Sequence, residues 1–440
     1  MLRLVRSAGA LALFGLCVPA ALAQPTLPTN VPRASTTDPR VALRAGYQDA
    51  ESASWNLQHV VNVPKPPAFT HADPIFGGGL DHTDMAFQGT TLFVGNYGGV
   101  LIYDIANPAQ PRLRSMIECP GGQGDVSVHG NLLFMSVEET RGRVDCGAEP
   151  ITQAVSAERF RGVRIFDVSN VERPVQVARV QTCRGSHTHT LVTDPRDASS
   201  VYVYVSGTAG VRSGDELAGC SADRSDADGS SYFRIEVIKV PLSAPQTASI
   251  VSSSRFLLGL APAPNHAANV AEVEAARARG GFIAVIEGNE VVVPDNAVRQ
   301  LLGQMVARRG GSGDPTAADS AALREALPAI VAQMGGGGER SGPTACHDIT
   351  VYPEVGLAGG ACEGYGILLD IRDPANPKRL DQAGDANFAY WHSATFNNDG
   401  TKVIFTDEWG GGTAARCRAT DRSGAPTRSS ASRAATRCAR

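Results

Sequence analysis

One apolar segment with a central aspartate and a closing proline occurs three times along this chain. The copies are GVLIYDIANPAQP (99–111), GVRIFDVSNVERP (162–174) and YGILLDIRDPANP (365–377), with Asp104, Asp167 and Asp370 in register. A weaker copy, RIEVIKVPLSAP, carries Lys239 in place of the aspartate. Such a repeat indicates a supersecondary unit that is used several times, because a single copy cannot bury its own apolar face.

Each copy belongs to a group of four short apolar runs. In the first group these are DMAF (84–87), TLFVGNY (91–97), GVLIYDI (99–105) and RLRSMI (112–117). Turn residues separate the runs, and β-branched, aliphatic and aromatic residues dominate them, which is typical of antiparallel strands. The sequence therefore predicts an all-β fold, a β-propeller of four-stranded antiparallel blades, about five of them recognisable in an incomplete ring.

The repeated segment has a definite place in such a blade. Because GVLIYDI is apolar almost throughout, it is expected to be the third strand, packed between neighbouring blades. The prolines of the N-P-x-x-P segment that follows lack backbone donors, and the segment turns the chain into the outermost strand.

These segments resemble the LVIVD repeat of secreted bacterial β-propeller proteins. CHDITVYPEVGLAGGAC, WHSATFNNDGTKVIFTDEWGGG and NLQHVVNVPKP are also similar to segments of LVIVD repeat-containing proteins. The resemblance covers roughly residues 55–260 and 344–418. It implies the propeller fold and no particular reaction, since the family is defined by its repeat.

Other segments interrupt or flank the repeats. The boundaries that we predict are a signal peptide (1–23), a flexible N-terminal segment (24–54), blades (55–260), a small α/β insert with Gly-rich linkers (261–343), further blades (344–412) and a basic tail (413–440). In the insert, FIAVIEGNEVVV predicts a hairpin, and apolar spacing predicts one helix that begins at Asp295 and a second through Leu323 and Leu327. The tail lacks Val, Ile, Leu, Met and aromatic residues. We interpret it as a truncated or frame-shifted reading, with a genuine disordered tail as the alternative.

The N-terminus indicates export. Arg3 and Arg6 precede an apolar run that ends in Ala21-Leu22-Ala23, which is the layout of a cleaved secretory signal. We expect a secreted, periplasmic or cell-surface protein that is cleaved near Ala23 and has no membrane span. Of the nine cysteines, eight remain after cleavage, and an even number in an oxidising compartment indicates disulfides. Candidate pairs that each close one loop are Cys119 with Cys146, Cys183 with Cys220, and Cys346 with Cys362, although the sequence leaves the connectivity open.

Charge argues against one class of partner. The chain carries a formal net charge of −4, and without Arg3, Arg6 and the tail, with its seven Arg and one Asp, the remainder is about −12. An acidic surface repels nucleic acid, so we expect none as a partner. An unidentified protein or a small polar ligand fits this composition better.

Histidines and carboxylates gather where blades begin. Those predicted to line the channel or bind a ligand are His82, Asp84, Asp125, His187, His189, His347, Asp348, His392, Asp407 and Glu408. Each first strand lies nearest the propeller axis, and residues i and i+2 of a strand share a face. Because imidazole nitrogens are good ligands for zinc, manganese or iron, the metal candidates are His82, His187, His189, His347 and His392. Glu138 and Glu139 could join them near one mouth.

Three interpretations of these residues remain open. They could join adjacent blades by hydrogen bonds, since buried polar groups need partners, or bind a metal or polar ligand, or catalyse a reaction. No G-x-S-x-G or C-x-x-C motif occurs, which argues against a serine hydrolase elbow and a zinc ribbon. We therefore predict a non-enzymatic binding or scaffold protein that uses its ring face or central channel. A metal-dependent hydrolase or lactonase with a divalent metal is the alternative, and partner binding by the insert is a third hypothesis.

Overall fold

The structure of this chain is a computed structural model. It describes residues 43–44, 50–70, 81–149, 151–223, 228–232, 234–262, 270–286, 289–293, 295–311, 313–331, 342–385 and 390–408. The predicted signal peptide, the basic tail and most of the predicted N-terminal segment lie outside these residues.

Four antiparallel sheets of four strands follow one another along the chain. Blade 1 contains β1 (His82–Gln88), β2 (Thr91–Asn96), β3 (Gly99–Asp104) and β4 (Arg112–Glu118). Blade 2 contains β5 (Val126–His129), β6 (Leu132–Val137), β7 (Gly162–Asp167) and β8 (Val175–Gln181). Blade 3 contains β9 (Thr188–Asp194), β10 (Asp197–Ser206), β11 (Ile235–Pro241) and β12 (Ser249–Ser254). Blade 4 contains β15 (Cys346–Tyr352), β16 (Leu357–Cys362), β17 (Tyr365–Asp370) and β18 (Lys378–Ala383). In the described part of the chain, blade 5 consists of β19 (Trp391–Phe396) and β20 (Val403–Asp407).

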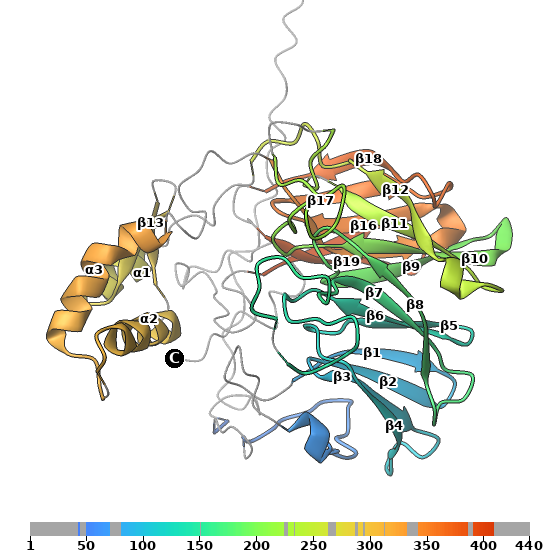
Figure 1. Cartoon of the computed structure of the whole chain (residues 1–440), viewed down its shortest axis with the longest axis horizontal. Helices are drawn as coiled ribbons and strands as arrows, with labels where there is room; N and C mark the ends of the chain where they lie inside the picture. The colour runs from blue at the N-terminus through green and yellow to red at the C-terminus, as the bar shows by residue number, and fades with distance from the viewer. Residues whose placement is uncertain are drawn as a thin grey trace, which may run out of the picture.

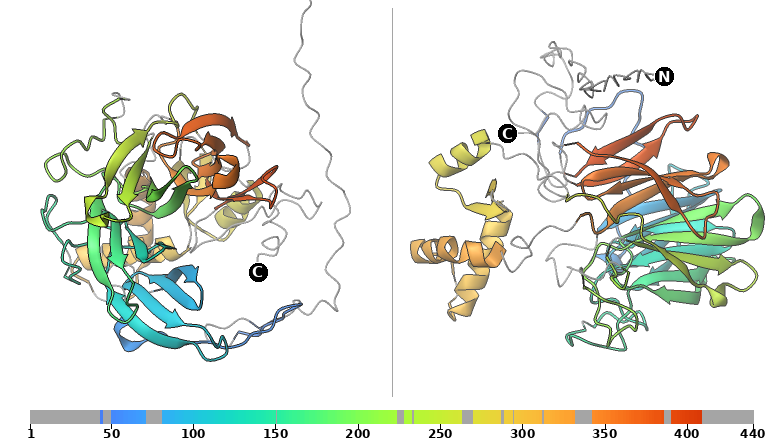
Figure 2. Two further views of the ribbon diagram at one scale, coloured as in Figure 1. Left: turned by 90° about the vertical axis from the view of Figure 1, so that its right-hand side faces the viewer. Right: turned by 90° about the horizontal axis from the view of Figure 1, so that it is seen from above.

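The blades are arranged around a common axis (Figure 1, and Figure 2, left). In each blade the strands pair in chain order, so every blade is a meander. The first strands contact one another in sequence, β1 with β5, β5 with β9, β9 with β15 and β15 with β19, and therefore lie innermost. This arrangement is a β-propeller, as the repeat predicts, and it brings the starts of the first strands together at the axis.

The repeated segment occupies the predicted place in its blade. Its apolar part forms β3, β7 and β17, and the side chains of β3 and β7 are buried up to the aspartate. Each aspartate then accepts a hydrogen bond from the backbone amide two residues later: Asp104 from Ala106, Asp167 from Ser169 and Asp370 from Arg372. These Asx turns end the third strand and direct the chain into the fourth.

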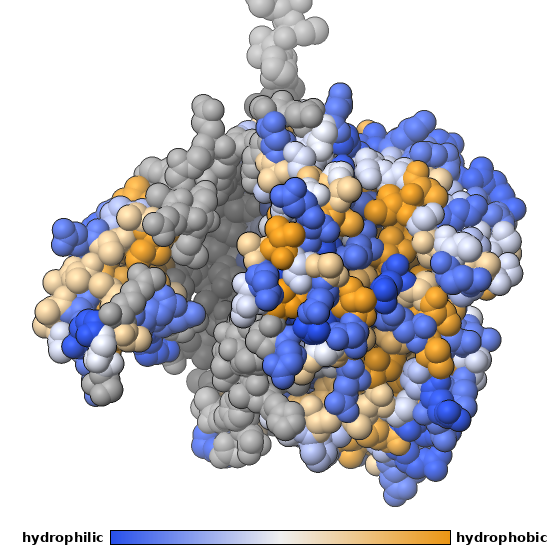
Figure 3. All heavy atoms as spheres, viewed as in Figure 1, coloured by the Kyte–Doolittle hydropathy of each residue, from blue (hydrophilic) through white to orange (hydrophobic). Residues whose placement is uncertain are grey.

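The hydrophobic core lies between blades rather than within one layer. Phe93, Val100 and Ile102 of blade 1 pack against Val126 and Met135 of blade 2. Similar clusters join blade 2 to blade 3 and blade 3 to blade 4. The outermost strands β4 and β18 are largely exposed, and the right edge of the propeller in Figure 3 is mainly hydrophilic.

The insert folds around its own small core beside the propeller (Figure 1). Its elements are α1 (Val270–Ala278), β13 (Ile283–Ile286), β14 (Asn289–Val292), α2 (Asp295–Arg308) and α3 (Ala317–Val331). The hairpin and the helix at Asp295 match the sequence prediction, whereas α1 was not predicted. Val298, Leu302 and Leu323 form the buried centre between α2 and α3.

Disulfides join the three candidate pairs. The bonds are Cys119–Cys146, Cys183–Cys220 and Cys346–Cys362, with sequence separations of 27, 37 and 16 residues. The other two cysteines of the predicted mature chain lie outside the described residues. Among the helices that the structure describes, none is long and apolar enough to cross a membrane.

Candidate metal centre

Three side chains with metal-binding atoms meet at the end of the axis where the first strands begin. His347 lies on β15, His392 on β19 and Glu408 directly after β20. Their candidate ligand atoms all lie within 4.8 Å of one another, and all three residues are partly buried. Chain segments far apart in sequence are thus brought together because blades 4 and 5 are neighbours.

His187, which directly precedes β9, extends this group to a third blade. Its Nε2 lies 2.8 Å from the Nε2 of His347. Glu408 Oε2 lies 3.9 Å from the Nε2 atoms of both His347 and His392, and the rings of these two histidines have centroids 3.9 Å apart. We call His187, His347, His392 and Glu408 the histidine cluster.

These distances fit a bound metal. Bonds from nitrogen or carboxylate oxygen to zinc are about 2.0 to 2.2 Å, so two ligands of a tetrahedral ion lie about 3.4 Å apart. The separations of 2.8 Å and 3.9 Å lie on either side of that value. Small side-chain rotations are therefore sufficient for several of these atoms to share one ion.

Neighbouring groups orient the histidine cluster. The Nδ1 of His187 lies 2.8 Å from Glu138 Oε2, and the Thr208 hydroxyl donates to the other oxygen of Glu138. The backbone amide of Glu408 donates to the Tyr390 carbonyl over 2.8 Å. A carboxylate on the distal nitrogen of an imidazole fixes its ring orientation and tautomer, as is common around metal-binding histidines.

Electrostatics differ between the two facing imidazoles. Burial, together with the charges of His187 and His392, lowers the pKa of His347 to about 3, so His347 is neutral at physiological pH. Burial also acts to lower the pKa of His187, but the hydrogen bond and charge of Glu138 outweigh it and raise this pKa above its ordinary value. His347 is consequently ready to donate a lone pair, and His187 binds metal only after it loses its proton.

Several other predicted residues connect blades instead. Asp84 Oδ2 accepts a hydrogen bond from the Val126 amide over 2.9 Å, which joins blade 1 to blade 2. Asp125 Oδ2 accepts from the His189 amide over 2.8 Å, and His189 Nδ1 lies 2.8 Å from the same carboxylate oxygen. His189 is therefore held between blades 2 and 3 and does not belong to the group whose ligand atoms meet.

The remaining predicted residues have separate surroundings. His82 is exposed, and its Nδ1 lies 3.1 Å from Asn96 Nδ2. Asp348 receives a hydrogen bond from the Ile349 amide, and burial together with the charge of Asp125 raises the pKa of Asp348 to about 6. Asp407 accepts a hydrogen bond from the Tyr390 amide and so joins the end of β20, next to Glu408, to the residue before β19.

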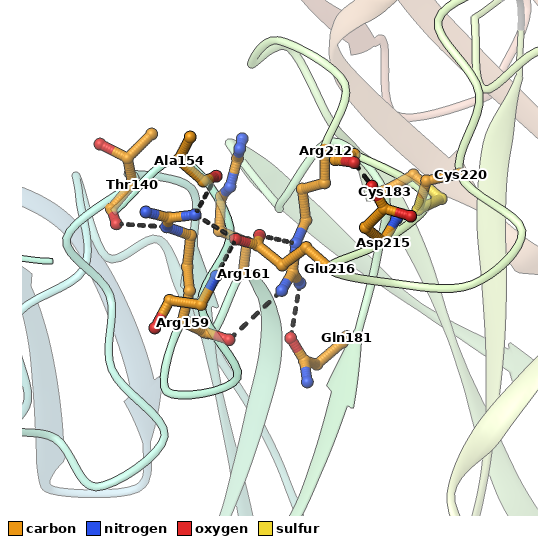
Figure 4. A network of polar contacts seen from close by, with 12 residues as sticks. Thr140, Ala154, Arg159, Arg161, Gln181, Cys183, Arg212, Asp215, Glu216 and Cys220 are labelled. Atoms are coloured by element: carbon orange, nitrogen blue, oxygen red, sulfur yellow. Dashed lines mark hydrogen bonds and ion pairs between the residues drawn. A yellow bond between two sulfur atoms is a disulfide. The ribbon is translucent and has the colours of Figure 1, made fainter. Parts of the chain in front are cut away.

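Sequence reasoning missed a buried ionic network beside Glu138. Glu216 binds both Arg159 and Arg212, and Arg212 Nε lies 2.6 Å from Glu216 Oε1 (Figure 4). Arg159 and Arg212 also donate to the Thr140 carbonyl and to Gln181. Arg159 lies in the segment after β6, which also contains Glu138, and Arg212 and Glu216 lie in the segment after β10, which also contains Thr208. The network therefore connects these two segments. The sequence carries no signal for the ion pair between Arg159 and Glu216, because these two residues are distant along the chain, whereas Arg212 and Glu216 are only four residues apart.

Comparisons with known proteins add distant structural likenesses. No protein-family model and no curated protein matches this chain. Among solved structures it is similar to Kuenenia stuttgartiensis hydrazine synthase (8% identity, TM-score 0.35, 76% of this chain and 63% of that chain). It is also similar to the Pseudomonas aeruginosa periplasmic gluconolactonase PpgL (11% identity, TM-score 0.37, 74% and 65%) and to the Cps50 (Swd1) β-propeller domain of Myceliophteria thermophila (11%, 0.33, 74% and 64%). This chain thus spans less than two thirds of each of these three chains.

Proposed function

We propose that this chain is an exported propeller of the LVIVD type that binds a divalent metal on its ring face through the histidine cluster. The observation that carries the proposal is the convergence of His347, His392 and Glu408, whose ligand atoms lie within 4.8 Å of one another. Two imidazoles and a carboxylate, with His187 as a further donor, suit zinc, iron, copper or nickel better than magnesium or calcium.

Export is supported by separate observations. The first 23 residues have the charge and apolar pattern of a cleaved signal, and three disulfides join loops of the propeller. Disulfides persist in oxidising compartments and are rare in the cytosol. A secreted or periplasmic location agrees with both.

A binding or scaffold role is the conclusion that we prefer. The propeller is a rigid scaffold. A metal bound by the histidine cluster would hold the side chains at one end of the axis in place, and an open coordination position on it could bind a polar ligand. Such a ligand would carry an oxygen or nitrogen donor, because these are the atoms that the proposed metals accept.

A metal-dependent hydrolase or lactonase is the second candidate, and one contact favours it. His187, a member of the histidine cluster, forms a carboxylate–imidazole pair with Glu138, whose Oε2 lies 2.8 Å from the His187 Nδ1. Such a pair could accept a proton from a water molecule held close to it. A metal with an open position would supply a water of lowered pKa.

Metal content tests the proposal. Mass spectrometry of the purified mature chain is expected to find close to one divalent metal per protein, and His347→Ala and His392→Ala are each expected to lose it. His59→Ala, which alters an exposed histidine, is the matched control and should keep the metal. If neither the purified protein nor protein titrated with Zn²⁺, Fe²⁺, Cu²⁺ and Ni²⁺ holds metal, the proposal is wrong.

Activity separates the two candidates. The metal-loaded protein is assayed on a panel of lactones and esters beside His392→Ala. Turnover that disappears in the variant would establish the enzyme, whereas bound metal without turnover favours the binding protein.

A further inference from the structure

A pocket lies where the outer edge of blade 3 meets blade 4. Its walls come from the end of β12 and the residues that follow it, and from the start of β18 with the turn before it. Its volume is about 440 Å³, within the roughly 300 to 1,000 Å³ that is typical of small-molecule sites. It shares no residue with the histidine cluster. We call it the outer pocket.

Three cations line the outer pocket. They are Arg255, which follows β12, and Lys378 and Arg379, which begin β18. The described residues that line the pocket include no carboxylate. Because the chain as a whole has a negative net charge, this wall of uniform positive charge differs from the average surface and favours an anion.

Backbone carbonyls hold the two guanidinium groups in place. Arg379 donates from Nη1 to the Phe256 carbonyl over 2.8 Å and from Nη2 to the Leu258 carbonyl over 3.2 Å. Arg255 donates from Nη1 to the Ser230 carbonyl over 2.9 Å. A carbonyl has no net charge, so these bonds orient the guanidinium groups without neutralising them. Planar donors fixed in this way suit the oxygens of a carboxylate, sulfate or phosphate.

A comparison with blade 1 shows why Lys378 is available to a ligand. Lys378 pairs with Asp370 in the ladder between β17 and β18, as Arg112 pairs with Asp104 between β3 and β4. In blade 1, Arg112 forms an ion pair with Asp104. In blade 4, Arg372 binds the equivalent carboxylate, with its Nε 2.9 Å from Asp370 Oδ1. Lys378 is exposed, and no described carboxylate forms an ion pair with it.

The turn of blade 4 also lacks an acid that the turn of blade 2 contains. With the repeat aspartates in register, Ala375 occupies the position of Glu172. Glu172 reaches back to blade 1 and pairs with Arg114 over 2.6 Å. Ala375 faces blade 3 in a similar way, since its carbonyl accepts a hydrogen bond from the Ser252 hydroxyl of β12, but its side chain cannot neutralise a cation. The boundary between blades 3 and 4 therefore keeps its positive charge.

We propose that the outer pocket binds a small organic anion, whose oxyanion group contacts Lys378, Arg379 and Arg255. Hydrogen bonds from charged donors to an oxyanion are stronger than those between neutral groups. Phe256 and Leu258 also line the pocket and offer an apolar surface to the body of the ligand. The proposal does not depend on the histidine cluster or on any bound metal.

Isothermal titration calorimetry on the full mature chain tests the proposal. The protein is first freed of metal with a chelator and dialysed, so that the probe cannot bind a metal at the histidine cluster. Phenyl phosphate is expected to bind at one site. Benzoate should bind more weakly because it carries less charge, and phenol, which is neutral, should not bind.

Substitutions assign the binding to the pocket. Lys378→Gln should weaken phenyl phosphate binding at least about fivefold, because a charged donor is lost. Arg379→Gln should have at least the same effect, and circular dichroism checks that this variant folds, since it also loses contacts with blade 3. Arg112→Gln, at the equivalent position of blade 1, is the matched control and should bind like wild type.

Lysine acetylation locates the site without any substitution. Phenyl phosphate should slow the acetylation of Lys378, measured by peptide mass spectrometry, and leave that of the exposed Lys402 unchanged. Three results would each overturn the proposal: no saturable binding of phenyl phosphate, binding that neither Lys378→Gln nor Arg379→Gln weakens, or equal protection of Lys378 and Lys402.

Discussion

Glu216 offers a direct test of how the loops beside the histidine cluster are held. Its side chain is 2% exposed and binds Arg159 and Arg212, whose side chains are 5% and 1% exposed. Glu216→Gln keeps the shape of the side chain and removes its charge. Two buried guanidinium groups then lose their only carboxylate partner within the drawn network (Figure 4).

The expected cost follows from burial. Removing one partner of a buried ion pair typically costs about 3 to 5 kcal/mol, because the remaining charge stays away from water without compensation. Glu172→Gln is the matched control: Glu172 pairs with Arg114 over 2.6 Å, but its side chain is 57% exposed. Exposed pairs contribute about 0 to 1 kcal/mol. The difference between the variants therefore measures burial rather than the loss of a carboxylate as such.

The same residue gives a pH prediction. Burial acts to raise the pKa of Glu216, but hydrogen bonds from the Ser156 amide and Arg212 and the charges of both arginines lower it below its ordinary value. Because the folded state holds the proton less tightly than the unfolded state, this carboxylate stabilises the fold above the unfolded pKa of about 4.3. Its contribution is lost as pH falls through the lower, folded pKa.

Urea unfolding of wild type and both variants, at pH 7 and at steps down to pH 3, tests these expectations. Glu216→Gln should be less stable at pH 7 by about 3 kcal/mol or more and should lose part of the acid dependence of wild type. Limited proteolysis should cut its segments after β6 and β10 sooner. The reasoning is refuted if Glu216→Gln costs no more than Glu172→Gln and leaves the acid dependence unchanged.

Three further substitutions test the contacts between blades. Tyr204→Phe removes the hydroxyl that donates to the Pro374 carbonyl over 2.9 Å, and should cost about 1 to 3 kcal/mol in urea unfolding because a buried acceptor is left unpaired. Phe134→Ala empties a fully buried position between blades 2 and 3 and should cost about 3 to 5 kcal/mol, so a value near zero would contradict the packing. Replacing Cys183 and Cys220 together by Ser opens a loop of 37 residues and should cost about 3 to 4 kcal/mol, measured by thermal unfolding without reductant.

The repeat made most of the fold predictable. An aspartate at the end of the third strand in three blades shows where the four strands of each blade begin and end, since its Asx turn follows β3, β7 or β17. Helix α1 was missed because its sequence, VAEVEAARA, is rich in Ala and Glu and has a weak amphipathic pattern. In blade 3 a long segment separates β10, which ends at Ser206, from β11, which begins at Ile235. The sequence alone assigns no structure to this segment.

The site was only partly predictable because the two-residue alternation of strands fails at blade entrances. His187 lies one residue before β9, so its side chain does not follow the alternating directions of the side chains in that strand. His189 lies within β9 and does follow them, which places it between blades. A register shift between His82 and Asp84 separates these two residues in the same way. The sequence rule that residues i and i+2 share a face holds only inside a regular ladder.

The same blade position can either join blades or hold a ligand, and the neighbouring blade decides which. Thr83 directly precedes Asp84, as His347 directly precedes Asp348, and the Thr83 hydroxyl donates to the Gln123 carbonyl in the connection to blade 2. A short side chain at this position reaches only the adjacent backbone. An imidazole is longer and extends past that backbone to the axis, where His347 and His392 meet. If the short residue that joins blades at this position is replaced by histidine on two neighbouring blades, the two imidazoles lie close together. The backbone of the propeller need not change.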